Sequence, residues 1–358
     1  MVGERIKQRR IALGLSLDQL SERTGSFVTK QAIHKYEQGT TMPGSDVLLK
    51  LAAALGVKVE FFFREPEHAV ELGEPAYRKR GSASAKSLNA IQASAKEFLE
   101  RYLFVESLFP ADRFGKFTIP SVPERTMRKL EDAETLSLGL RKRWNLGIDA
   151  IEDVMEIFED RGVKVVLLGG EESFDGLSSW ANTKVPVVVV RKGLPGDRQR
   201  FNLAHELGHL LMIHSRKFDS EKAAHRFAGS FLVPAEAAYQ ELGATRRHID
   251  ILELAMLKEK YGMSMQAWIF RAHDLEIISD SYASSLYKLF RAKGWNRNEP
   301  GKAVPEETPH RLERLILQAA SEDLISPPRA AELLGKPLDE FRKKMGAVLV
   351  GGETAVSS

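Results

Sequence analysis

The chain has 358 residues, a formal net charge of +3 and 43% apolar residues, which is enough for two or three domains with packed cores. It contains no cysteine, so disulfides and thiolate metal sites are excluded and any zinc must be bound by histidine and carboxylate groups. No apolar run approaches a membrane span and the first residues lack the apolar core of a signal peptide, so we expect a cytoplasmic protein with no membrane partner.

Four short helices are predicted in the first 65 residues. An opening helix precedes a second one that begins at the cap residue Ser16 and stops at Gly25. Residues 29–37 and 45–55 are predicted to form the third and fourth helices. Short helices joined by tight, glycine-containing turns are typical of a helix-turn-helix motif.

Two stretches of this region carry a family resemblance. Residues 6–15 (IKQRRIALGL) and 32–39 (AIHKYEQG) resemble the Cro-like, or xenobiotic-response-element, class of helix-turn-helix DNA-binding domains. The resemblance implies a double-stranded DNA operator as partner and a homodimer that binds an inverted repeat. It also implies a structural ion pair between Arg10 and Glu37.

The third helix, residues 29–37, is the expected recognition helix, with Ile33 and Tyr36 facing the core. The side chains expected to face outward and to contact DNA are Lys30, Gln31, His34 and Lys35. Gln31 is the candidate for base reading, because a glutamine amide can pair with adenine through two hydrogen bonds. The two lysines can bind either guanine or phosphate, and residue type does not separate these roles.

A predicted linker and a long helix follow. Residues 66–87 contain proline, glycine, serine and alanine in close order, which indicates a linker. Apolar residues then recur with a helical period from 88 to 109. This apolar face is either a coiled dimer contact or part of the core of the next domain, and we favour the core.

Three short runs rich in β-branched residues lie at 163–168, 176–180 and 185–190. They predict a small twisted sheet beside the helix that follows. An edge strand of such a sheet can hold a peptide by main-chain pairing, and the alternative is that the strands serve only to support the helix.

Residues 205–209 read HELGH, the most informative motif of the chain. Histidines four residues apart lie on one face of a helix, so His205 and His209 can reach a single tetrahedral ion. Glu206 lies about 100° round the helix, where it can hydrogen-bond a metal-bound water without being a ligand. This is the arrangement needed for metal-assisted peptide hydrolysis.

The alternative is a surface helix with two incidental histidines. Asp197 is expected to cap this helix, and apolar residues cover most of its circumference, which is typical of a buried helix. Burying two histidines and a glutamate costs several kcal/mol unless a partner such as a cation satisfies them. The flanking sequence therefore favours the metal site.

A site with two histidines needs a third protein ligand, and the fourth position is left for water. The downstream candidates are His214, Asp219, Glu221, His225 and Glu236. We favour Glu221, because Asp219 or Ser220 can cap a helix over residues 221–234 and Glu221 heads an apolar stripe on that helix.

Residues 197–211 (DRQRFNLAHELGHLL) and 221–234 (EKAAHRFAGSFLVP) together resemble the ImmA/IrrE-type zinc metallopeptidases, and residues 175–180 resemble a further family segment. The resemblance implies His205, His209 and Glu221 as zinc ligands, with manganese as the alternative ion, and Glu206 as the base that activates water. His225 stands where the family often has Asn or Asp, a position that can orient a ligand from the second coordination shell.

The sequence therefore predicts an α+β fold that is mostly α. An all-α helix-turn-helix domain precedes a zincin-like domain with a small β-sheet and the HExxH helix, and a helical C-terminal region without an assigned role follows. The predicted boundaries are 1–65 for the helix-turn-helix domain, 66–87 for the linker, 88–280 for the ImmA/IrrE-like domain and 281–358 for the C-terminal region.

Two functions from different classes remain open. In the first, the chain is a DNA-binding transcriptional regulator and zinc endopeptidase that cleaves a repressor or antitoxin-like protein in a stress, mobile-element or defence response, under control of a signal, a partner or DNA. In the second, it is a non-proteolytic repressor or antitoxin whose protease-like domain senses a ligand or partner. The intact set of His205, Glu206, His209 and Glu221 favours the first.

Overall fold

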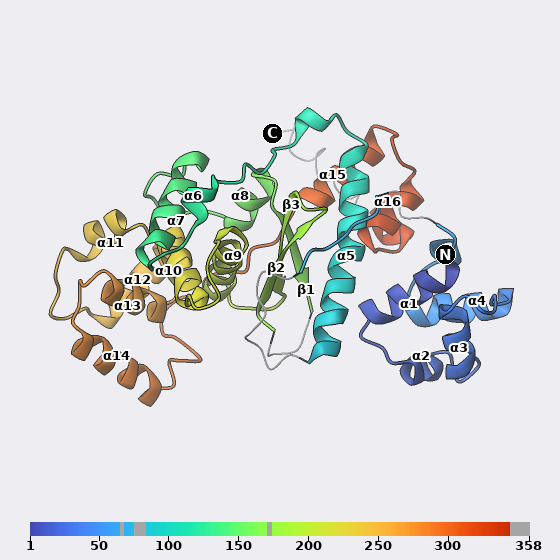
Figure 1. The fold of residues 1–358 in the computed structure, drawn as a ribbon, viewed down its shortest axis with the longest axis horizontal. Coiled ribbons are helices and arrows are strands. Elements are labelled where there is room, and N and C mark those ends of the chain that lie inside the picture. Colours follow the sequence, from blue (N-terminus) through green and yellow to red (C-terminus); the bar gives the residue numbers. More distant parts are fainter. Residues whose placement is uncertain (65–67, 75–83, 170–173, 344–358) are drawn as a thin grey trace, which may run out of the picture. The chain divides into compact units, whose positions relative to one another are not determined.

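The computed structural model describes residues 1–64, 68–74, 84–169 and 174–343, which are mostly helical with one small sheet (Figure 1). Contacts group the chain into two compact units. The first compact unit comprises Met1–Val70, Gln92–Phe114 and Pro309–Ser358. The second compact unit comprises Glu71–Ile91 and Gly115–Thr308. The domain boundaries given above divide the chain by sequence, whereas these units group residues by contact, so the boundaries stay predictions.

Five short helical segments open the first compact unit: α1 (Val2–Ala12), α2 (Leu17–Arg23), α3 (Lys30–Glu37), α4 (Ser45–Leu55) and the 3₁₀ helix η1 (Val59–Phe62). Side-chain caps, of which Ser16 was predicted, explain where two of them begin. Ser16 forms a capping box with Gln19, and the Thr29 hydroxyl accepts a hydrogen bond from the Ala32 amide. Their shared core is fully buried at Ile6, Leu20, Ile33, Leu51 and Phe62.

The other elements of this unit are α5 (Ala85–Ser107) from Gln92 onward, the 3₁₀ helix η2 (Ala111–Arg113), α15 (Arg311–Ser321) and α16 (Pro327–Leu334). The apolar face of α5 is buried in the chain, as favoured above. Val105 near its C-terminal end, together with Phe109 just beyond it, packs on the two C-terminal helices through Ile316 and Ala330. A helical period reveals that a face is buried but not which partner covers it, so the assignment of the rest of this face to the core of the next domain stays a prediction.

The sheet of the second compact unit confirms the three predicted strands. These are β1 (Lys164–Leu168), β2 (Gly176–Ala181) and β3 (Val185–Arg191), in the order β1-β3-β2. β3 pairs parallel with β1 and antiparallel with β2. The central strand is buried from its second to its sixth residue, as expected for a strand with neighbours on both edges.

Nine helices of this unit lie within the described residues: α6 (Val122–Arg125), α7 (Glu131–Trp144), α8 (Val154–Asp160), α9 (Gly196–Leu211), α10 (Ser220–Leu232), α11 (Ala235–Leu242), α12 (Ile251–Tyr261), α13 (Met265–Asp274) and α14 (Asp280–Ala292). Helix α9 lies beside the sheet, and α7 and α10 pack against each other (Figure 1). Leu207, Phe227 and Trp268 are fully buried in their common core.

One predicted cap in this unit is wrong. Helix α9 begins at Gly196 with Pro195 as its N-cap, so Asp197 already lies inside the first turn. The Asp197 carboxylate instead faces Lys258 of α12, with Oδ2 3.3 Å from Nζ. Asp197, which the local pattern predicted as a cap, therefore forms a long-range ion pair instead. Asp219 does cap α10, accepting from the Lys222 amide at 3.1 Å.

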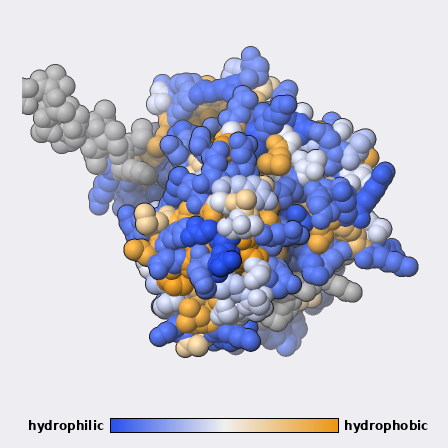
Figure 2. Space-filling view, turned by 90° about the vertical axis from the view of Figure 1, so that its left-hand side faces the viewer, coloured by the Kyte–Doolittle hydropathy of each residue, from blue (hydrophilic) through white to orange (hydrophobic). Residues whose placement is uncertain are grey.

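The face of the molecule seen in Figure 2 is mainly hydrophilic, and its apolar residues form separate patches. On α12, Leu252 and Met256 are 69% and 65% exposed. No helix within the described residues is long and apolar enough to cross a membrane.

Candidate metal centre and DNA-facing helix

Helices α9 and α10 bring together the three predicted ligands. Gly208, next to His209, permits this close approach, because a Cβ at its position would lie 2.9 Å from a ring carbon of Phe227 on α10. A glycine inside a helix costs about 1 kcal/mol relative to alanine. The close packing of the two helices supplies the structural reason for it here.

The donor atoms converge at one point. The Nε2 atoms of His205 and His209 lie 3.0 Å apart. Glu221 places Oε1 3.2 Å from His209 Nε2 and Oε2 3.8 Å from His205 Nε2. Ligand atoms held about 2.0 to 2.1 Å from a tetrahedral zinc ion lie about 3.4 Å apart. The three groups thus have the spacing of one metal-binding triad, and they are the only such cluster in the part of the chain that the structure describes.

Burial sets the protonation of the first histidine. Burial and the neighbouring His209 and His225 lower the pKa of His205 to about 2. Its imidazole is therefore neutral at pH 7, which is the form that binds a metal ion.

Glu206 is 5% exposed and lies beside strand β2. The Ser178 hydroxyl donates a hydrogen bond to its Oε2 at 2.9 Å. A Cβ on Gly176 would lie 2.9 Å from the Glu206 Cγ, so the glycine leaves room for this side chain. Burial raises the pKa of Glu206 to about 7, although the nearby His209 and the Ser178 hydrogen bond oppose the rise. A carboxylate with a pKa near neutrality is suited to accepting and returning a proton.

The free edge of β2 is occupied by the chain's own residues from the predicted linker. Leu72 pairs antiparallel with Ala181. The Gly73 amide donates to the Trp180 carbonyl at 2.9 Å, and the Asn182 amide donates to the Glu71 carbonyl at 2.8 Å. The Ser179 hydroxyl adds a hydrogen bond to the Gly73 carbonyl at 2.8 Å. The sheet therefore gains a short fourth element on the strand that also contacts Glu206.

Two family models match this chain, one over the N-terminal helices and one over the sheet and the metal triad. Residues 6–62 match the helix-turn-helix family, and residues 158–273 match the IrrE N-terminal-like domain. The chain joins a helix-turn-helix domain to an IrrE-like domain. The second match contains the metal triad, Glu206 and all three strands.

Curated relatives match the helix-turn-helix end. An uncharacterized HTH-type transcriptional regulator of Sinorhizobium medicae is 38% identical over 90 residues, 25% of this chain and 60% of the relative. An uncharacterized transcriptional regulator in the ATPase CF(0) region of Rhodospirillum rubrum is 38% identical over 76 residues, 21% of this chain and 65% of the relative. The chain spans less than two thirds of the length of these relatives.

The other candidate ligands of the IrrE-like domain lie elsewhere or have other roles. His214 is exposed beyond the end of α9, and Asp219 caps α10. His225 is exposed, and its ring packs edge-on against His205 with the centroids 4.8 Å apart. A role of His225 in orienting the ligand histidine stays a prediction.

In the helix-turn-helix domain, the predicted DNA-facing residues are all exposed on α3: Lys30, Gln31, His34 and Lys35. Ile33 is buried in the core, as expected. The predicted ion pair is present, since Arg10 Nε and Nη2 lie 2.6 and 2.7 Å from the two carboxylate oxygens of Glu37. This bidentate pair fixes the C-terminal end of α3 against α1.

Sequence reasoning missed Ser178, Gly176 and Gly208. The segment 175–180 had been singled out by its resemblance, but the pattern did not tell which serine meets Glu206. Neighbouring side chains of a strand point to opposite faces, so Ser178 reaches Glu206 while Ser179 bonds to Gly73. Only the position of the helix against the sheet separates the two.

Proposed function

We propose that this chain is a DNA-binding transcriptional regulator whose IrrE-like domain is a zinc-dependent endopeptidase. The observation that carries the proposal is the convergence of His205, His209 and Glu221 on one point with Glu206 beside them. Relatives named as transcriptional regulators and the exposed polar face of α3 support the regulatory part.

The donor set suits zinc. Two imidazole nitrogens and one carboxylate leave a fourth tetrahedral position open for water or substrate. Manganese accepts the same donors and is the alternative ion. A zinc ion bound there would polarise the scissile carbonyl and lower the pKa of the attacking water.

The chain's own residues then carry the proton. Glu206 lies next to the ligand His209 on the helix, where it can accept a proton from the attacking water and return it to the leaving amine. The Ser178 hydrogen bond fixes Oε2, which leaves Oε1 for the water. The burial of Glu206 excludes bulk water from this step.

Strand β2 supplies the place for a peptide. A segment that pairs antiparallel with β2 from Trp180 toward Gly176 passes directly beside Glu206, since both Ser178 and Gly176 contact that side chain. The main-chain pairing binds an extended segment largely without regard to sequence. A repressor or antitoxin-like protein is the proposed substrate.

The chain itself offers a second substrate. Residues 71–73 already pair with the far end of β2 and run in the direction required. Residues 75–83, the middle of the predicted linker at 66–87, lie outside the described residues. Cleavage in this linker would separate the helix-turn-helix domain from the rest of the chain.

Intact-mass measurement tests the proposal. Wild type and Glu206→Gln are incubated with zinc or manganese, with and without operator DNA and single-stranded DNA, and together with proteins encoded beside the chain. We expect fragments from wild type and a loss of rate of about 10²- to 10⁴-fold in Glu206→Gln, with the metal retained. An identical fragment pattern from both proteins would trace the cut to a contaminating protease.

A matched pair of variants separates self-cleavage from cleavage of a partner. Gly73→Pro removes the amide that donates to Trp180, whereas Gly73→Ala keeps it and places its Cβ at an ordinary 3.4 Å from the Trp180 oxygen. If the linker is the substrate, Gly73→Pro slows the cut and Gly73→Ala does not. Equal rates in both variants would exclude the β2 edge as the binding site of the linker.

The occupied edge of β2 also favours a second function. A regulator whose substrate edge is filled by its own chain can act as a non-proteolytic repressor or antitoxin whose IrrE-like domain senses a ligand or partner. The two functions differ in one measurement. Operator control that persists unchanged in Glu206→Gln favours the sensor, and control that is lost with this carboxylate favours the peptidase.

A further inference from the structure

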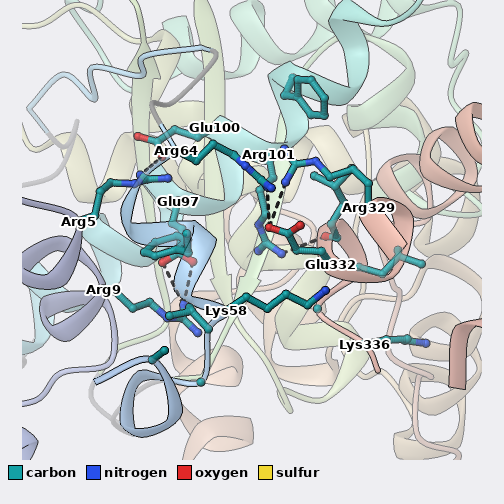
Figure 3. A pocket seen from close by; sticks show the side chains of 18 of the residues that line it. Arg5, Arg9, Lys58, Arg64, Glu97, Glu100, Arg101, Arg329, Glu332 and Lys336 are labelled. Atoms are coloured by element: carbon teal, nitrogen blue, oxygen red, sulfur yellow. Dashed lines mark hydrogen bonds and ion pairs between the residues drawn. The ribbon is translucent and has the colours of Figure 1, made fainter. Parts of the chain in front are cut away.

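A cavity of about 730 Å³ lies within the first compact unit, and none of its lining residues belongs to the metal triad (Figure 3). Its walls come from α1, the end of α4 and η1 on one side and from α5 and α16 on the other. Pockets that bind small molecules usually measure about 300 to 1,000 Å³. The cavity therefore has room for a ligand the size of a nucleotide.

Positive charge predominates in its lining. Five arginines and two lysines face three carboxylates, so four positive charges remain in excess. The arginines are Arg5, Arg9, Arg64, Arg101 and Arg329, and the lysines are Lys58 and Lys336. They come from segments that are far apart in the sequence, so the excess is created by the fold and not by a local run of charge.

All three carboxylates are already paired. Glu97 lies 2.8 Å from Arg9, and Glu100 lies 3.2 Å from Arg5. Glu332 is shared by Arg64 and Arg329, at 2.7 and 3.0 Å. These pairs are drawn as dashed lines in Figure 3. They hold the opposing walls in place.

Arg101 and Lys58 are the two lining cations without an ion pair to a described residue, since Lys336 lies 3.8 Å from Glu340, which does not line the cavity. Within the described residues neither forms an ion pair, although Arg101 donates from Nη1 to the Leu333 carbonyl at 3.1 Å. The Arg101 Nε atom is buried and has no hydrogen-bond partner there. Burial lowers the pKa of Arg101, although Glu97 acts against it. A largely buried guanidinium with an unpaired N–H group and no direct ion pair is costly, and an anion in the cavity would lower that cost.

We propose that this cavity binds a small molecule that carries phosphate groups. Guanidinium groups present paired N–H donors that match phosphate oxygens, and ammonium groups such as Lys58 add a point charge. Phe61 and Phe104 supply apolar walls beside the charges. A ligand with two or more anionic groups matches the surplus of four charges better than a single carboxylate does.

An effect on DNA would follow through α1, and this step rests on the proposed function. Helix α1 carries Arg5 and Arg9 at the cavity and Arg10 in the bidentate pair with Glu37 of α3. A Cβ on Gly3 would lie 2.0 Å from the Tyr36 oxygen, so α1 and α3 are in close backbone contact. A ligand that contacts Arg5 or Arg9 therefore acts on α1, the helix that supports α3.

Isothermal titration calorimetry on the full chain tests the binding step. The probes are ATP, inorganic pyrophosphate, inorganic phosphate and citrate. We expect ATP or pyrophosphate to bind one per chain and more tightly than citrate. Arg101→Met should weaken this binding about tenfold, the loss of one charge-assisted interaction, and Lys58→Met should weaken it a few-fold.

The control is Lys35→Met, an exposed lysine on the DNA-facing helix α3 that does not line the cavity. It should leave binding unchanged. Circular dichroism checks that each variant folds, and Lys58→Met, at an exposed position, keeps the test decisive if Arg101→Met unfolds. Loss of binding in Lys35→Met but not in Lys58→Met would place the anion on the DNA face and overturn the proposal.

Two further results would also overturn it: no binding of any probe at millimolar concentration, or tighter binding of citrate than of the phosphates. Operator affinity measured with and without pyrophosphate then reports the coupling. Failure of the wild type to prefer any operator would contradict the proposed function while leaving the calorimetric result intact, so the two failures are distinguishable.

Discussion

The predicted recognition helix and the predicted metal triad use the same kind of secondary structure in opposite ways. Helix α3 displays Lys30, Gln31, His34 and Lys35 to solvent, and none of them is buried. Helix α9 keeps Glu206 and His209 buried, and His209 lies 3.2 Å from Glu221 of the second helix, α10. An exposed face acquires its specificity only when DNA is present, whereas a buried cluster carries its geometry in the folded chain.

This difference decides how each region responds to mutation. Exposed side chains can be exchanged at little cost to folding, so their loss should affect binding alone. Buried polar groups are held by partners, so their loss affects folding, the site or both. The predictions below use this contrast, in order of decreasing effect.

The largest effect should come from removing the metal triad. We expect one zinc ion per chain in wild type and none in the double variant His205→Ala, His209→Ala, measured by elemental analysis. His214→Ala, which changes an exposed histidine outside the triad, is the control and should keep the metal. Unchanged metal content in the double variant would refute the site, and manganese in place of zinc would leave the site correct and the ion wrong.

Next is the buried network that holds α10. Glu134 lies 3.0 Å from Arg271, which is 1% exposed, and 3.3 Å from Arg226 of α10. Glu134→Gln leaves a buried guanidinium with less counter-charge and should lower the free energy of unfolding by about 3 to 4 kcal/mol at pH 7. Glu131→Gln, at a 56% exposed position, should cost less than about 0.5 kcal/mol. Equal costs for the two variants would contradict the structural role of the network.

Glu134 also gives the stability a pH dependence. Burial raises the pKa of Glu134, but hydrogen bonds and positive charge from Arg271 and Arg226 together lower it by more. The pKa therefore lies below the ordinary 4.5. The stabilisation is therefore complete above pH 4.5 and is lost as the pH falls through the lowered pKa. Urea unfolding should show wild type and Glu134→Gln converging below about pH 4. A difference that stays constant down to pH 3 would show that the charge of Glu134 is not what stabilises the fold.

A glycine tests the other region without touching its exposed face. Gly3→Ala places a Cβ 2.0 Å from the Tyr36 carbonyl oxygen, so α1 and α3 must separate. We expect a loss of about 3 kcal/mol in unfolding free energy and weaker binding to all DNA. Gly44→Ala has open space around its Cβ and is the control. An unaffected Gly3→Ala protein would show that the close contact between the two helices is dispensable.

The smallest effect concerns single base pairs. Gln31→Ala should reduce discrimination at one position of the operator by about 1 to 3 kcal/mol and leave the unfolding midpoint unchanged. A lysine of α3 that contacts phosphate should instead weaken all sequences alike and reduce the salt dependence of binding. Fluorescence anisotropy with operator and random duplexes measures both. Equal affinity of wild type for the two duplexes would contradict the regulatory function.

The sequence by itself determined the local elements and most of the metal triad. Caps such as Ser16 and Asp219 and the periods of the strands and helices predicted where elements lie, because these signals come from neighbouring residues. The two histidines share a helix face by spacing alone. Glu221 followed from a second helix with its own cap and apolar stripe, supported by the family resemblance.

Only the tertiary structure decided which faces meet. Four contacts join segments that are distant in the chain. Residues 71–73 pair with β2, and Ser178 donates a hydrogen bond to Glu206. Asp197 forms an ion pair with Lys258 instead of capping α9, and the C-terminal end of α5 packs on the C-terminal helices. The cationic cavity is likewise assembled from α1, η1, α5 and α16. Helical periods and caps record contacts within a few residues, whereas these contacts depend on how whole elements pack, and no local pattern encodes that packing.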